Sequence, residues 1–109
     1  MSYLVQKFGG TSVGDLERIE NVAGIIASEV RKNNKVIAIV SAMSGETNRL
    51  VEQVKKTSPV YDGREYDVIV STGENITAGL LAIKLQDLGI PARSWMGWQI
   101  PIITTSMHS

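Results

Sequence analysis

The stretch from Val5 to Gly14 constrains this chain most, because an apolar run ends there in closely spaced glycines. Its sequence is Val-Gln-Lys-Phe-Gly-Gly-Thr-Ser-Val-Gly, and a helical pattern follows directly. A strand that passes through glycines into a helix N-terminus leaves backbone N–H groups facing a ligand. Those groups favour an anion, most often a phosphate. Lys7 adds a positive charge at the mouth of the turn. We therefore interpret the stretch as a phosphate-binding turn.

The turn differs from the two familiar glycine-rich phosphate motifs. Gly9 and Gly14 have the spacing of P-loop glycines, but Asp15 and Leu16 stand where that motif needs Lys and Ser or Thr. No G-x-G-x-x-G is present either. Taken alone, these residues fit an ordinary strand-to-helix turn with a solvated lysine about as well as a phosphate site.

The composition narrows the class of protein. The chain has 109 residues, which suits one domain or part of one, with 11 Lys and Arg against 11 Asp and Glu. That balance gives no basic excess to recruit nucleic acid or an anionic membrane. Without cysteine there are no disulfides or thiolate metal sites, which fits a cytoplasmic protein. We see no signal peptide and no apolar run long enough to span a bilayer.

Hydrophobic periodicity predicts alternating strands and helices. The first element is a strand over 3–8, and the second is a helix over 15–32. The apolar positions of that helix form one buried face: Leu16, Ile19, Val22, Ala23, Ile26 and Val30. The next element, Val36 to Val40, is an unbroken apolar run, as in a parallel strand covered on both faces.

The second half of the chain is less regular. We expect a short helix over 47–56, a loop over 57–64, a helix over 74–88, and strands over 92–95 and 102–104. The run from Tyr66 to Val70 stays open, because β-branched residues favour a strand but the run is too short to decide. Together the elements predict an α/β fold with a mostly parallel sheet. Ligands of such sheets bind beyond the carboxyl ends of the strands, where 7–12 and 41–46 lie.

Four segments resemble motifs of the aspartokinases, in the amino-acid kinase superfamily. Lys7-Phe8-Gly9-Gly10-Thr11-Ser12 resembles their opening motif. The second and third motifs are matched by Val-Ser-Ala-Met-Ser-Gly-Glu-Thr-Asn at 40–48 and Val-Ser-Thr-Gly-Glu at 70–74. The turn Gly97-Trp98-Gln99 also matches. The motifs occur in the family's order, and the second favours aspartokinase over sister kinases for glutamate, acetylglutamate, carbamate or UMP.

The resemblance implies a three-layer αβα fold and an activity. ATP, with the Mg²⁺ that it carries, would phosphorylate the β-carboxylate of L-aspartate, the first step toward lysine, threonine and methionine. The implied phosphate contacts are the catalytic Lys7 with Phe8, Gly9, Gly10, Thr11 and Ser12. No residues suggest a metal held by the protein itself.

The resemblance also implies an aspartate pocket. Ser41 and Thr47 would donate hydrogen bonds to the carboxylates, and Glu74 would bind the α-ammonium group. Each assignment has a structural alternative. Thr47 has the residue type of a helix N-cap, and Ser71 with Glu74 has the spacing of a capping box.

The resemblance covers only the N-terminal part of the family's catalytic domain. We expect residues 1–109 to lack the adenine site and the regulatory domains, and to be inactive alone. A homo-oligomer, or association with the missing part of the enzyme, would follow. Two alternatives remain: a non-catalytic module that binds phosphate or carboxylate or only assembles with a partner, and another amino-acid kinase.

Overall fold

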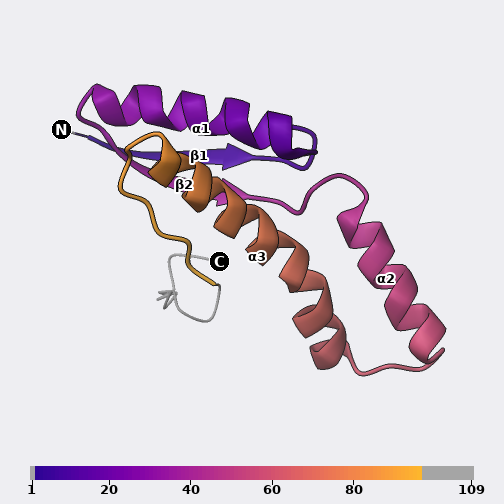
Figure 1. Ribbon diagram of the computed structural model, residues 1–109. Helices are drawn as coiled ribbons and strands as arrows, with labels where there is room; N and C mark the ends of the chain where they lie inside the picture. The colour runs from indigo at the N-terminus through magenta and orange to yellow at the C-terminus, as the bar shows by residue number, and fades with distance from the viewer. Residues whose placement is uncertain (1, 97–109) are drawn as a thin grey trace, which may run out of the picture.

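The computed structural model describes residues 2–96, which form two parallel strands and three helices (Figure 1). In chain order the elements are β1 (Tyr3–Phe8), α1 (Leu16–Arg31), β2 (Lys35–Val40), α2 (Glu46–Thr57) and α3 (Gly63–Asp87). The expected α/β fold with a parallel sheet is confirmed, as are both strands and the first two helices, within a residue or two. The Gly-Trp-Gln turn and the expected strand over 102–104 lie outside the described residues.

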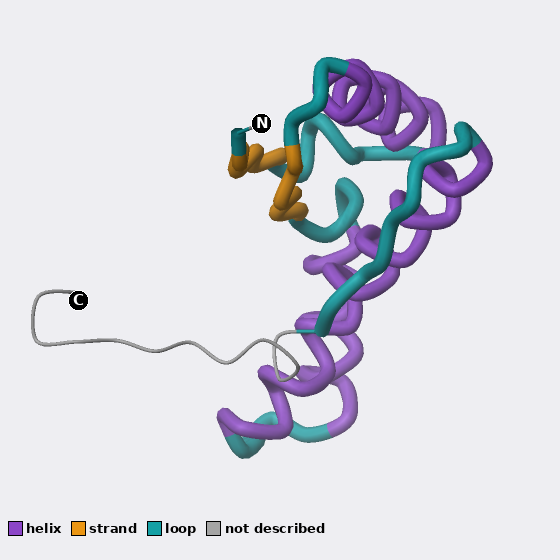
Figure 2. Tube along the Cα trace, turned by 90° about the vertical axis from the view of Figure 1, so that its left-hand side faces the viewer, coloured by secondary structure: helices purple, strands orange, loops and turns teal. Residues whose placement is uncertain are grey.

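The two strands pair in parallel, with Tyr3 opposite Lys35 and Phe8 opposite Val40. Alternate residues face α1 and α3, namely Leu4, Gln6, Phe8, Val36, Ala38 and Val40. The other face is open in the described part of the chain, because Val5, Ile37 and Ile39 are 65%, 54% and 48% exposed. Figure 2 shows the helices on one side of the strands. The described residues thus form two of the three expected layers, and the expectation that β2 is covered on both faces is not met among them.

Helix α1 packs its apolar face on β2 and α3. Ile19, Val22, Ala23 and Ile26 are buried as expected, whereas Leu16, at the first position of the helix, is 64% exposed. The side chain of Asp15 caps the helix by accepting from the N–H of Arg18 at 2.9 Å. At the other end Asn33 adopts a left-handed conformation, and the Asn34 N–H donates to Glu29 O at 3.2 Å. This is a Schellman motif, which ends the helix and turns the chain toward β2.

Helix α3 begins eleven residues earlier than the sequence pattern predicts, at Gly63 instead of Glu74. The carboxylate of Asp62 accepts from the N–H groups of Arg64 and Glu65 at 2.8 and 3.1 Å, so it is the N-cap. Tyr66 to Val70, which the sequence left open, is therefore helical. The capping box of Ser71 and Glu74 is wrong, because Ser71 lies inside the helix and its hydroxyl donates to Val68 O.

The C-terminal end of α3 follows the sequence. Gly89 has φ +81°, and the N–H of Ile90 donates to Leu85 O at 2.9 Å, which is again a Schellman motif. Leu85 and Ile90 are both buried in the core that the helix shares with α1. The expected strand over 92–95 is wrong, since these residues pair with neither strand of the described sheet.

The length of α3 bears on the expectation that no segment could span a bilayer. Among the described residues this one helix is long and apolar enough to cross a membrane. It has 25 residues and a mean hydropathy of 1.3 over its most apolar window. Helices of protein cores pass the same test, and α3 contacts α1, α2 and β2. Only 28% of that apolar window is buried among the described residues. Helix α2 and the start of α3 extend past the end of the sheet (Figure 1).

Candidate functional site

The loops that follow β1 and β2 lie against each other at one edge of the sheet. The N–H of Ser41, just after β2, donates to Phe8 O, the last carbonyl of β1, at 3.2 Å. A methyl group built on Gly10 would lie 3.4 Å from Ala42 O, and one on Gly14 would lie 3.0 Å from Ser44 Oγ. Parallel pairing thus brings together the two loops that the sequence motifs single out.

The first loop is a closed turn. The N–H of Ser12 donates to Gly9 O at 3.0 Å, and Arg18 reaches back from α1 to donate from Nη1 to Thr11 O at 2.8 Å. Within the described residues, the N–H groups of Gly10 and Thr11 donate to no protein acceptor. A turn fixed on both sides with two free N–H groups can bind an anion.

Lys7 and Phe8 lead into this turn from the end of β1. Lys7 is exposed on the open face of the sheet, and it forms no ion pair with any residue from 2 to 96. Phe8 faces the opposite side and packs against the core. The structure therefore leaves the Lys7 ammonium available to a ligand, while the Phe8 side chain packs against the core.

The second loop ends in the first turn of α2. Gly45 has φ +78° and precedes the helix without any side-chain cap, so Thr47 is not the N-cap, and that alternative is wrong. Glu46 pairs with Arg49, and the hydrogen bond from Arg49 lowers the pKa of the Glu46 carboxyl. The exposed Thr47 hydroxyl has no partner in the described part of the chain, so it is free to donate.

Helix α3 meets the second loop at Gly73. A methyl group there would lie 2.9 Å from Ala42 Cβ and 3.5 Å from Glu46 Cγ. Glu74 follows Gly73 and is exposed, with no ion-pair partner among residues 2–96. The start of α2 and the middle of α3 are thus held against the loop that begins at Ser41. Thr47 and Glu74 each lie one residue beyond a member of this contact, Glu46 and Gly73 respectively.

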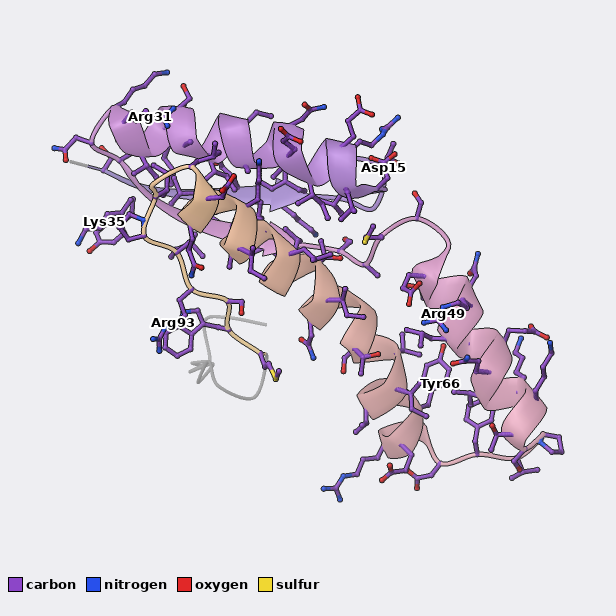
Figure 3. The ribbon with its side chains drawn as sticks, viewed as in Figure 1. Asp15, Arg31, Lys35, Arg49, Tyr66 and Arg93 are labelled. Carbon is purple, nitrogen blue, oxygen red and sulfur yellow. The ribbon has the colours of Figure 1, made fainter. Side chains whose placement is uncertain are left out.

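A hollow of about 530 Å³ lies on the other side of the glycine turn. Its lining residues are Phe8, Ser12, Asp15, Glu17, Arg18, Asn21, Val22 and Ile25. Two carboxylates against one guanidinium make it a poor site for a phosphate. Figure 3 shows Asp15 at the end of α1 nearest to the chain that leads from β2 into α2. Two of the predicted phosphate contacts, Phe8 and Ser12, line this hollow, whereas Lys7 is exposed on the open face of the sheet.

Sequence reasoning missed three residues that shape this site. Arg18 fixes the turn through Thr11 O, and Ala42 and Gly73 form the contact between the second loop and α3. Arg18 was detectable, because a basic residue three positions after a helix N-cap can reach back over the preceding turn. The contact of Ala42 with Gly73 joins residues far apart in the chain, and no local pattern encodes it.

The chain is similar to proteins named as aspartate kinases. It is 48% identical to the aspartokinase of Rickettsia felis over 112 residues, which cover 100% of this chain and 28% of that relative. It is also 48% identical to an aspartate kinase of Pseudomonas putida over 109 residues, covering 100% of this chain and 26% of that relative. The chain therefore spans about a quarter of the length of these curated relatives.

The crystal structure of aspartate kinase from Synechocystis has a similar fold. The match has a TM-score of 0.75 and 45% sequence identity, and it covers 77% of this chain and 14% of that one. The model of the amino acid kinase family matches residues 2–103. That match takes in nearly the whole sequence and confirms the resemblance of the motifs. This chain therefore belongs to the amino acid kinase family.

Proposed function

We propose that this chain is the N-terminal catalytic part of an aspartate kinase. One observation carries the proposal: loops whose sequences resemble the aspartokinase motifs converge on one edge of the sheet, around Ala42. In the reaction, a β-carboxylate oxygen of aspartate attacks the γ-phosphorus of ATP. The new O–P bond forms as the bond from phosphorus to the bridging oxygen breaks, and ADP leaves.

The glycine turn and Lys7 would hold the phosphoryl group in transfer. The reaction spreads negative charge over the phosphoryl oxygens, so fixed N–H groups and a cation stabilise its transition state. The N–H groups of Gly10 and Thr11 and the ammonium of Lys7 suit that task, because none of them has a partner among residues 2–96. The hydroxyls of Thr11 and Ser12 would add contacts, and the backbone of Phe8 and Gly9 would set the approach.

Aspartate would bind between the second loop and α3. Its carboxylates would accept hydrogen bonds from the hydroxyls of Ser41 and Thr47, and its α-ammonium group would pair with Glu74. Thr47 and Glu74 suit these roles because both are exposed and neither has a partner among residues 2–96.

The described residues would bind ATP at its phosphates. The turn offers N–H donors, whereas no group of three or more metal-ligating side chains occurs between residues 2 and 96. Magnesium would arrive with the nucleotide and neutralise phosphate charge. Residues outside this chain would hold the adenine. We further propose a cytoplasmic enzyme that assembles as a homo-oligomer and acts without nucleic acid or membrane.

The test uses the parent enzyme, which is the whole enzyme that contains this chain. Incubation with Mg-ATP, aspartate and hydroxylamine traps an acyl phosphate as a hydroxamate, and a coupled assay measures ADP. Glutamate, N-acetylglutamate, carbamate and UMP serve as competing acceptors. We expect hydroxamate and ADP to form in equal amounts with aspartate, and not with the other acceptors. A preference for another acceptor assigns a sister kinase, and no transfer to any acceptor leaves a binding or assembly module.

A further inference from the structure

Gly73 brings α3 as close to the second loop as packing permits. A methyl group on Gly73 would lie 2.9 Å from Ala42 Cβ, and 3.5 Å from both Glu46 Cγ and Leu50 Cδ1. Non-bonded carbon atoms pack best at about 3.5–4.0 Å. The Ala42 contact is thus the one that excludes a side chain, while those with Glu46 and Leu50 are of ordinary length.

Ala42 also touches the glycine turn from its other side. Its carbonyl oxygen lies 3.4 Å from the position that a methyl group on Gly10 would take. The residue is buried, with 7% exposure. One small residue therefore separates the turn that carries the free N–H groups from the helix that carries Glu74.

We propose that the contact between Ala42 and Gly73 sets the distance between the phosphate turn and Glu74, the aspartate-binding residue on α3. The inference rests on the proposed function. Ser41 directly precedes Ala42, and Glu74 directly follows Gly73, so each lies beside one member of the contact. Ala42 and Gly73 are thus positioning residues: they do not touch the reacting atoms but fix the groups that do.

The substitution Gly73→Ala tests this spacing. The added methyl group must move away from Ala42 by about 0.6 Å to reach normal packing. A displacement of about 1 Å at a reacting centre can lower a rate roughly 10²-fold, so we expect kcat/KM for aspartate to fall about tenfold. KM for aspartate should rise while KM for ATP stays unchanged. Simple loss of folded enzyme would lower kcat without changing either KM.

The double variant Ala42→Gly with Gly73→Ala moves the methyl group from one side of the contact to the other. It restores room at Ala42 and leaves the distances to Glu46 and Leu50 at 3.5 Å. We expect it to regain most of the aspartate affinity that G73A loses. The matched control is Gly79→Ala on the same helix, because nothing lies within 4 Å of a methyl group there. That variant should keep the parent's kinetics.

The experiment measures steady-state kinetics of the parent enzyme and these variants. Ala42→Gly alone is included to complete the double-mutant cycle. A raised KM for aspartate in G73A that A42G relieves supports the spacing role. If G73A does not fold, A42G alone, which widens the same contact, must change the KM for aspartate and not that for ATP. Equal kinetics of G73A and G79A, or a G73A defect that A42G does not relieve, overturns it. A parent enzyme that does not phosphorylate aspartate overturns the proposed function and this inference together.

Discussion

Substituting Asp62 by Ala tests where α3 begins. The Asp62 carboxylate accepts from two N–H groups of the first turn, those of Arg64 and Glu65. Loss of such an N-cap costs about 1 kcal/mol, within a range of about 0.5–2 kcal/mol. At about 0.59 kcal/mol for RT, that is roughly a fivefold increase in local opening. Native-state hydrogen exchange at Tyr66, whose N–H donates to Asp62 O at 3.0 Å, should speed up by that factor, since local opening exposes this amide. The amides of Arg64 and Glu65, which lose their acceptor, should speed up at least as much.

Ser71→Ala is the matched control for this prediction. If the helix began near Glu74, the Ser71 hydroxyl would be its cap, and its loss would carry the same penalty. Inside α3 its hydroxyl only donates to Val68 O at 3.1 Å, and Ala is a better helix former by a few tenths of a kcal/mol. We expect exchange in S71A to be unchanged or slower. Faster exchange in S71A, with no change in D62A, would refute the long helix.

Two further predictions concern the site and the open sheet face. Glu74→Gln in the parent enzyme should weaken aspartate binding by about 2–5 kcal/mol, if the carboxylate is desolvated around the α-ammonium group, and leave ATP binding unchanged. Calorimetric titration with each ligand measures this, and unchanged aspartate affinity would contradict it. Residues 1–109 alone should show no aspartate-dependent ADP release and should self-associate through the apolar face of Val5, Ile37 and Ile39. Turnover by the isolated chain would contradict the first expectation. A monomer across a concentration series in light scattering would contradict the second.

The sequence predicted those elements whose signals are local. β1, β2 and α1 have clear periodicity and end signals, so their positions agree within a residue or two. The start of α3 was missed because Ser71 and Glu74 mimic a capping box, whereas the actual cap, Asp62, precedes a glycine that suggested a loop. The strand expected over 92–95 does not form among the described residues. Strands form only with a partner edge, and local composition does not supply one.

For the candidate site, the motifs located the loops but not their packing. The order of the parallel strands was enough to place Gly10 and Ser41 at one edge of the sheet. The free N–H groups of the turn, the reach of Arg18 and the contact of Ala42 with Gly73 depend on how the backbone and side chains are placed in three dimensions. Capping roles at Thr47 and Ser71 were plausible from residue type, and the structure excludes both.

The kinetics of Lys7→Ala in the parent enzyme test the central claim most directly. Loss of one transition-state contact of this kind should lower kcat by about 10²- to 10³-fold, with a much smaller change in KM for aspartate. Lys35→Ala is the matched control, because Lys35 lies on the same face at the opposite end of the sheet, over the ring of Tyr3. We expect the K35A variant to keep the parent's kcat. A K7A variant within a few fold of the parent's kcat, or an equal loss in K35A, would contradict the account.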